Sequence, residues 1–170
     1  KTALPDLQYA TSGGSAVPLS LQDDFFTATG VELTASMGMT ECGGYLVVPP
    51  YGEPRRGSVG LPIQGAEVRL LGPDGLDAGP DGPGQIAVRT KAMMAGYWND
   101  PENTAKVLVD GWLLTGDLAR RGAGGYYFVE GRIKDTIIHD TGNISPLEVE
   151  AVLDEHPGVA ASGVVGVPDE

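Results

Sequence analysis

The abundance of glycine and proline is the feature that most limits what this chain can fold into. Among its 170 residues are 26 glycines and 13 prolines, together about 23% against roughly 12% in an average protein. Both residue types interrupt regular helices and both are favoured in turns. The sequence therefore predicts many turns and short strands, with few long helices.

Charge and cysteine content exclude several classes of protein. The net charge of −12 predicts an acidic surface that repels phosphate backbones, so we expect no nucleic acid partner. Cys42 is the single cysteine, which rules out an intramolecular disulfide and fits a reducing, cytoplasmic setting. No apolar run approaches the roughly 18 residues of a membrane-spanning helix, and no signal-peptide pattern is visible. We expect a globular protein without a transmembrane segment.

Residues 1–54 are expected to form short strands around one helix. A helix should begin after Pro18, with apolar side chains on one side, and end at Gly30. The remaining expected elements are a strand over 7–11, a small-residue loop over 12–16, a strand over 31–35 and a loop over 36–41.

From about Gly57 the pattern changes to alternating apolar and polar residues, which indicates a β meander. Strands are expected over 67–71 and 85–89, and again over 112–114 and 126–129. A short helix over 99–107 should have Pro101 near its first position.

The strongest local signal is a capping box, in which Ser145 and Glu148 would cap each other's backbone at a helix start, with Pro146 between them. This helix should run to about His156. A buried strand is expected over 159–167. A second lobe would therefore begin near 132–135.

Two glycine-containing clusters in the first part could hold a nucleotide. Gly13, Gly14 and Ser15 would let a flat ring or a phosphate approach the backbone, although taken alone they are better explained by a tight strand-to-helix turn. In the cluster over 38–41, the Thr40 hydroxyl could hold a phosphate oxygen and the Glu41 carboxylate its Mg²⁺. The alternative is an ordinary hydroxyl-containing turn with a solvated glutamate.

Two further clusters lie in the second part. In Thr115-Gly116-Asp117, the carboxylate after a glycine turn could accept hydrogen bonds from two ribose hydroxyls, or the three residues could simply form a turn. In the cluster over 131–135, Arg132 and Lys134 could bind an anion or form a solvated group of ion pairs.

Taken together and in this order, the clusters resemble the adenylate-forming (AMP-binding) enzyme superfamily, in particular acyl-CoA synthetases. The likeness extends through Gly57-Ser58-Val59-Gly60, Gly96-Tyr97-Trp98-Asn99, Gly111-Trp112-Leu113 and Asn143-Ile144-Ser145-Pro146. Each motif is weak alone, but their common order over almost the whole chain is specific.

The resemblance implies an α+β fold in three parts. Residues 1–132 would be the C-terminal part of a large domain, with the end of an α/β subdomain over 1–54 and a distorted β-barrel subdomain over 55–132. Residues 133–170 would be a hinge and the start of a small, mobile α+β C-terminal domain. The family's phosphate loop would precede residue 1 and its C-terminal catalytic lysine would follow Glu170, so we expect this piece to be inactive without the rest of its parent polypeptide.

The resemblance also implies a two-step reaction, in which a carboxylic acid and ATP with Mg²⁺ form acyl-AMP, and coenzyme A then takes the acyl group. Thr40, Glu41 and the hinge residue Lys134 would be the catalytic residues, and Glu41 the metal ligand. The nucleotide would contact Gly13, Gly14, Ser15, Met37, Gly38, Thr40, Asp117 and Arg132. Met37 stands where the family usually has an aromatic residue, and a thioether can also pack on an adenine ring.

Two alternative functions stay open. The acyl group could pass to the thiol of a carrier protein instead of coenzyme A. A non-catalytic binding or regulatory domain could also retain this fold. Asp140-Thr141 replaces a Gly-Gly pair of the family, and a Cβ at Thr141 would crowd the thiol tunnel that this loop lines in the second step. The acid itself, fatty or aromatic, is not identified by the sequence.

Overall fold

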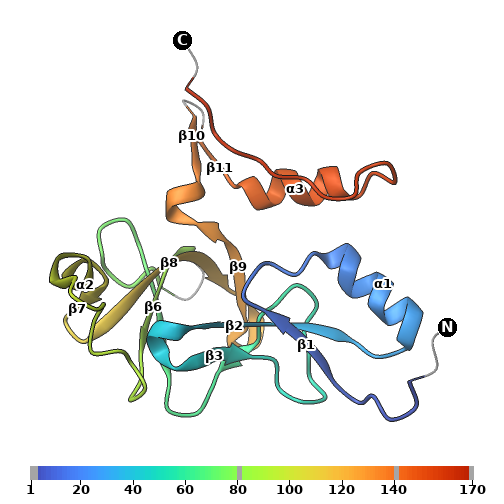
Figure 1. Cartoon of the computed structure of the whole chain (residues 1–170), viewed down its shortest axis with the longest axis horizontal. Helices are drawn as coiled ribbons and strands as arrows, with labels where there is room; N and C mark the ends of the chain where they lie inside the picture. Colours follow the sequence, from blue (N-terminus) through green and yellow to red (C-terminus); the bar gives the residue numbers. More distant parts are fainter. Residues whose placement is uncertain (1–3, 80–81, 140–141, 169–170) are drawn as a thin grey trace.

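Two β-sheets and a C-terminal segment make up the structure, a computed structural model that describes residues 4–79, 82–139 and 142–168 (Figure 1). The first sheet has the strand order β1-β2-β3-β4, in which β1 and β2 are parallel and the other pairs are antiparallel. Its strands are β1 (Ala10–Gly13), β2 (Leu33–Met39), β3 (Gly44–Val48) and β4 (Leu61–Pro62).

Helix α1 (Leu19–Thr29) connects the parallel strands β1 and β2. It begins after Pro18 and ends at Gly30, whose φ of 83° is left-handed and whose N–H donates to the Phe26 carbonyl at 2.7 Å. Glycine adopts this conformation without the steric cost of a Cβ, which is why the helix ends there. Both expected ends of the helix are confirmed.

Strand β2 is longer than the sequence indicated. It was expected to end at residue 35, but it continues to Met39 because β3 pairs with it, through Met37–Val47 and Met39–Gly44. The expected loop over 36–41 is therefore wrong for its first part. Only its last part lies outside the strand, in the 3₁₀ turn η1 (Thr40–Cys42).

The second sheet is antiparallel and curled, and it has the order β5-β6-β8-β7, with β9 also pairing with β8. Strand β8 is long enough to carry β7 and then β9 along one edge while β6 lies along the other. The elements are β5 (Glu67–Leu71), β6 (Gly84–Arg89), α2 (Pro101–Val107), β7 (Leu108–Val109), β8 (Trp112–Arg121), η2 (Ala123–Gly125) and β9 (Tyr127–Arg132). The β5–β6 hairpin and α2, with Pro101 at its first position, confirm the expectations for this part.

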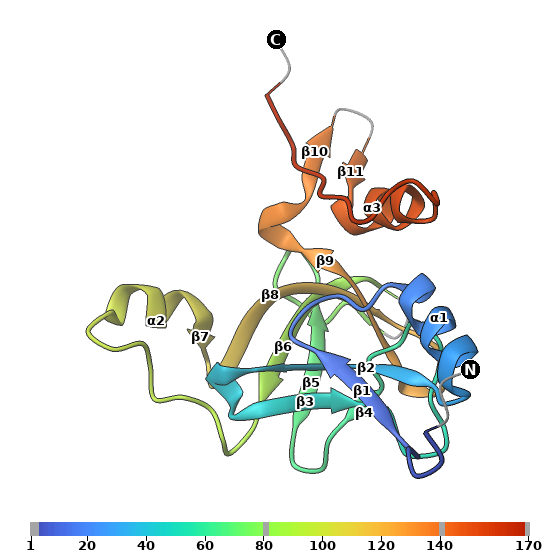
Figure 2. The same cartoon turned by 45° about the vertical axis from the view of Figure 1, so that its right-hand side comes forward.

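The two sheets meet where the segment before β4 pairs with the start of β9 (Figure 2). The Tyr127 N–H donates to the Gly60 carbonyl at 2.9 Å, and the Val59 N–H donates to the Tyr127 carbonyl at 3.0 Å. Both sheets contribute to one core, whose largest fully buried side chains are Leu46, Val47, Ile86, Val88 and Leu113. The fold is thus mixed α+β with a curled half-barrel sheet.

The C-terminal segment stands away from the sheets and follows β9 through η3 (Figures 1 and 2). Its elements are η3 (Ile133–Asp135), β10 (Ile137–His139), β11 (Gly142–Ile144) and α3 (Pro146–Asp154). Helix α3 begins where expected, but the Ser145 hydroxyl does not cap it. That hydroxyl donates instead to the Glu130 carbonyl of β9 at 2.6 Å, which ties the helix start to the sheet.

The buried strand expected over 159–167 is wrong. These residues pair with no strand among the described residues, and Val165 and Val167 are exposed. An apolar run forms a strand only when a neighbouring edge supplies hydrogen bonds and a packed face. The departure at Asp140-Thr141 lies outside the described residues. No helix in the described part of the chain is both long and apolar enough to cross a membrane.

Candidate functional site

Two of the predicted nucleotide-binding glycines are required by the first sheet itself. Gly13 pairs with Ser36, and a Cβ on Gly13 would lie 2.9 Å from the Ser36 carbonyl oxygen. A Cβ on Gly38 would lie 2.3 Å from the Gly44 carbonyl oxygen on β3. Neither site has room for a side chain, so close packing of strands alone explains both residues. Gly14 differs, since its φ of +86° favours glycine and a Cβ there would face open space.

These glycines nevertheless border a cavity of about 240 Å³ at the end of the sheet, formed by the β1 end, the β2 end and the start of β3. Its lining residues are Gly13, Gly14, Gly38, Met39, Gly44 and Tyr45. The predicted residue Ser15 is exposed beside this edge. Glycines leave backbone atoms accessible, so a flat ring could approach the chain closely here.

Met37 is only 8% exposed and belongs to the buried core cluster. The structure therefore gives this thioether a packing role in the core, in the cluster that also contains Ala35 and Cys42. Contact with an adenine ring stays a prediction.

Glu41 lies in η1 directly after β2, and the segment before α2 holds it at two points. The Tyr97 hydroxyl donates to Glu41 Oε1 at 3.0 Å, and the Met94 N–H donates to the Glu41 carbonyl at 2.7 Å. The sequence alone does not place Tyr97 in the site, because 56 positions separate it from Glu41. Burial, followed by the neighbouring Glu41 carboxylate, raises the pKa of Tyr97, which keeps its hydroxyl protonated as a donor.

The Glu41 carboxylate has the chemistry of a single protein ligand for Mg²⁺. Its second oxygen, Oε2, accepts no hydrogen bond from the described residues. Within 4–79, 82–139 and 142–168 no group of three or more histidine, cysteine or acidic residues surrounds a common point. Mg²⁺ is commonly held by one or two carboxylates with phosphate oxygens and water, and Glu41 with adjacent Thr40 fits that pattern.

Cys42 follows Glu41 but has no part in this chemistry. Its side chain is buried, and this burial, with a smaller effect of Glu41, raises the thiol pKa from its ordinary value of 9.0 to about 11. The thiol is therefore protonated near neutral pH and contributes to packing.

Asp117 lies in a β-bulge rather than in a turn at a strand end. The pairing of β8 with β6 shifts between Gln85–Leu118 and Ala87–Leu114, so β8 holds extra residues there, and Gly116 has a φ of +77°. The Thr115 hydroxyl donates to the Ile86 carbonyl at 3.0 Å and accepts from the Asp117 N–H at 3.1 Å. This replaces the lost ladder bonds and sets the position of Asp117.

Asp117 and Arg132 face each other across β8 and β9. Arg132 Nε donates to Asp117 Oδ1 at 3.1 Å, and the Asp117 side chain is 17% exposed while that of Arg132 is 57% exposed. Burial raises the pKa of Asp117, and the Arg132 guanidinium only partly offsets this. The carboxylate is thus short of donors, and Oδ2 accepts no hydrogen bond from the described residues. Two ribose hydroxyls are the kind of donors such a group would accept.

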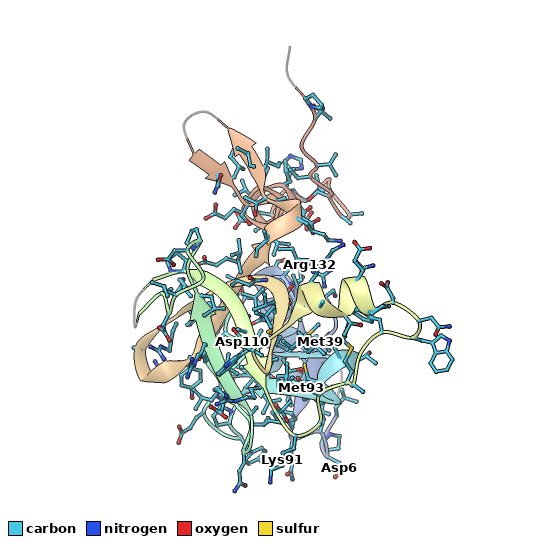
Figure 3. The ribbon with its side chains drawn as sticks, turned by 90° about the vertical axis from the view of Figure 1, so that its left-hand side faces the viewer. Asp6, Met39, Lys91, Met93, Asp110 and Arg132 are labelled. Atoms are coloured by element: carbon cyan, nitrogen blue, oxygen red, sulfur yellow. The ribbon has the colours of Figure 1, made fainter. Side chains whose placement is uncertain are left out.

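The two predicted carboxylates, Glu41 and Asp117, are held by separate partners and, within the described part of the chain, do not form one hydrogen-bond network. Among the described residues, no hydrogen bond or ion pair joins Glu41 to Asp117. Figure 3 shows Arg132 above Met39, the residue that ends β2. Lys134 is exposed in η3, directly after β9, and its hinge role stays a prediction.

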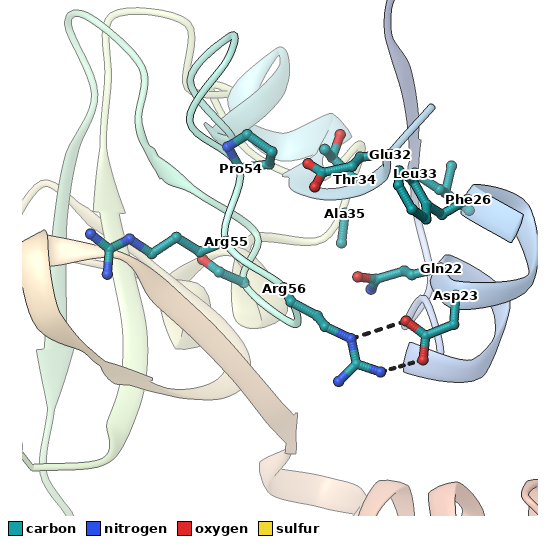
Figure 4. A pocket seen from close by; sticks show the side chains of 11 residues that line it. Gln22, Asp23, Phe26, Glu32, Leu33, Thr34, Ala35, Pro54, Arg55 and Arg56 are labelled. Carbon is teal, nitrogen blue, oxygen red and sulfur yellow. Dashed lines mark hydrogen bonds and ion pairs between the residues drawn. The ribbon is translucent and has the colours of Figure 1, made fainter. Parts of the chain in front are cut away.

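A second cavity, of about 150 Å³, lies between α1, β2 and the segment over 54–58 (Figure 4). Arg56 forms an ion pair with Asp23 of α1 at its edge, and Gln22 is buried beside it. None of the predicted site residues lines this cavity.

Comparison with known proteins relates the chain to one enzyme family. The sequence profile of the AMP-binding enzyme family matches residues 1–98. A 3-hydroxybenzoate–CoA ligase of Aromatoleum sp. (strain CIB) is 40% identical over 97% of this chain and 32% of its own length. A fatty acid–[acyl-carrier-protein] ligase, ScoC, of Streptomyces coeruleorubidus is 37% identical over 96% of this chain and 33% of its own.

Among solved structures, the anthranilate CoA ligase AuaEII in complex with anthranoyl-AMP superposes with a TM-score of 0.88 and 31% identity, over 95% of this chain and 31% of that one. The chain thus spans about a third of the length of the relatives it matches. A family profile over more than half of the residues, and a fold shared with a ligase structure, agree with the motif order, and the chain therefore belongs to the AMP-binding enzyme family.

Proposed function

We propose that this chain is part of an AMP-forming acid–CoA ligase, which activates a carboxylic acid with ATP and transfers the acyl group to coenzyme A. The observation that carries the proposal is the half-buried Asp117 carboxylate, which is set by a β-bulge, paired with Arg132 and still short of hydrogen-bond donors. The similarity to CoA ligases supports the same function.

In the proposed first step, a carboxylate oxygen of the acid forms a bond to the α-phosphorus of ATP, and the bond to pyrophosphate breaks. Asp117 would accept hydrogen bonds from the ribose hydroxyls, and the edge at Gly13 and Gly14 would lie along the base. Thr40 would donate to an α-phosphate oxygen and Glu41 would hold Mg²⁺, which when bound neutralises negative charge on the phosphates. Positioning and charge stabilisation supply most of the rate in phosphate chemistry of this kind.

In the second step a thiol attacks the acyl carbon, a thioester forms and AMP leaves. We propose that residues 1–132 belong to the large domain, including a barrel-like subdomain over 55–132, and that residues 133–170 begin a mobile domain turning about Lys134. Its position in η3, directly after β9 and at the start of the segment that stands away from the sheets, supports this role.

A carrier-protein thiol is the second candidate acceptor, and the similarity to ScoC favours it. The two candidates share the first step and differ only in the thiol. Product formation by the intact protein with free coenzyme A, against formation with a phosphopantetheine-bearing carrier protein alone, separates them.

The experiment that tests the first step is acid-dependent ATP–pyrophosphate exchange by the intact protein, with a panel of fatty and aromatic acids. We expect exchange with at least one acid, and a loss of about 10²-fold or more in Glu41→Gln. The matched control is Asp23→Asn, which changes an exposed carboxylate at the other cavity and should leave exchange unchanged. AMP binding without exchange for any acid would favour a non-catalytic domain.

A further inference from the structure

The contact between Tyr97 and Glu41 joins the end of the first sheet to the segment that precedes α2. The phenolic hydroxyl donates to one carboxylate oxygen at 3.0 Å and leaves the other without a partner among the described residues. Tyr97 is 39% exposed, and the next residue, Trp98, is almost fully exposed, so this tyrosine does not fill the core. Its contact therefore has to be explained by the hydroxyl rather than by burial of the ring.

The tyrosine is itself held by the N-terminus of α2. Its N–H donates to Thr104 Oγ1 at 2.9 Å, and that hydroxyl donates to the Asp100 carbonyl at 2.7 Å. A Cβ on Gly96 would lie 2.9 Å from Thr104 Cγ2, so the segment packs directly against the helix. Asp100 in turn caps α2 by accepting from the Asn103 N–H at 3.0 Å. The donor thus has a rigid support.

The same segment also holds the backbone of Glu41, through the Met94 N–H at 2.7 Å. Both the main chain and one carboxylate oxygen of the glutamate are therefore fixed by a single stretch of chain. A free glutamate side chain samples several rotamers, and restricting them costs up to about 2 kcal/mol. Where the protein has already restricted them, that cost does not fall on ligand binding.

We propose that Tyr97 is a positioning residue, which fixes the Glu41 carboxylate so that Oε2 is directed to the divalent cation of the bound nucleotide. This rests on the proposed function, because it takes Glu41 as the metal ligand. Tyr97 acts through Glu41, and Thr104 acts through Tyr97.

The test is Tyr97→Phe in the intact protein, which removes only the hydroxyl. Mn²⁺ binding is measured in the presence of ATP by electron paramagnetic resonance, and the Mg²⁺ dependence of pyrophosphate exchange is measured beside it. We expect a rise of about 5- to 10-fold in the metal dissociation constant, as for the loss of one ordinary hydrogen bond, because Tyr97 acts on the metal only through Glu41. The change in kcat at saturating Mg²⁺ should stay below about twofold. If Tyr97 had only a structural role, Tyr97→Phe would lower the unfolding midpoint and would not weaken metal binding selectively over kcat.

Tyr51→Phe is the matched control, because Tyr51 is 73% exposed and its hydroxyl bonds to no described residue. In a Glu41→Gln background, Tyr97→Phe should have no further effect on metal binding. If Glu41→Gln weakens Mn²⁺ binding and Tyr97→Phe does not, the positioning role is wrong while the proposed function stands. If Glu41→Gln leaves Mn²⁺ binding unchanged, the metal assignment of the proposed function is itself wrong.

Discussion

Replacing Asp117 with alanine is expected to lower kcat/KM for ATP in acyl-AMP formation by about 10²- to 10⁴-fold. Two ribose hydroxyls would lose their charged acceptor, and hydrogen bonds to a charged group contribute about 1.5–3 kcal/mol each, so the loss is about 3–6 kcal/mol. The partner left behind, Arg132, is 57% exposed and can be solvated, so little of the effect should come from an unpaired charge. The measurement is pyrophosphate exchange by the intact protein over a range of ATP concentrations.

Asp23→Ala is the matched control for this change. Asp23 also pairs with an arginine, Arg56, but on the exposed edge of the cavity that none of the predicted site residues lines. It should change kcat/KM by less than about twofold, as expected for an exposed ion pair. Equal losses in the two variants would contradict a ribose-binding role for Asp117.

Gly60→Ala is expected to lower the free energy of unfolding by about 3 kcal/mol or more. A Cβ at this position would lie 2.0 Å from the Val48 carbonyl carbon and 2.1 Å from its oxygen, and the φ of Gly60 is +101°. The blocking atoms belong to the backbone at the end of β3, so no side-chain movement can relieve the clash. Because Gly60 also pairs with Tyr127, relief by backbone movement would separate the two sheets.

Urea denaturation followed by tryptophan fluorescence checks this prediction. Gly163→Ala is the control, since a Cβ there would meet nothing within 4 Å and its φ lies outside the left-handed region. We expect that variant to unfold within about 0.5 kcal/mol of the parent chain. A similarly small change for Gly60→Ala would contradict the close approach of Gly60 to the end of β3.

Elements with local signals could be predicted from the sequence. The left-handed residue Gly30 ends α1, Pro101 begins α2 and the alternating residues of β5 and β6 form a hairpin. Each of these signals depends on residues a few positions apart, and the physical preference acts at the same short range.

Features that depend on distant partners could not be predicted in the same way. Strand β2 continues through Gly38 because β3 pairs with it, and Thr115-Gly116-Asp117 is a bulge because β6 and β9 flank it. The Ser145 hydroxyl donates to the Glu130 carbonyl of β9 instead of capping α3. For the candidate site, the motif order predicts Glu41 and Asp117, but only the structure reveals the tyrosine that donates to the first of these carboxylates.

The most direct test of the proposed nucleotide site is a crystal structure of the intact protein with AMP or an acyl-AMP analogue. We expect both ribose hydroxyls within hydrogen-bond distance of the Asp117 carboxylate, and the base along the edge formed by Gly13 and Gly14. A nucleotide bound in the cavity between α1 and β2, or one that leaves Asp117 paired only with Arg132, would contradict the assignment.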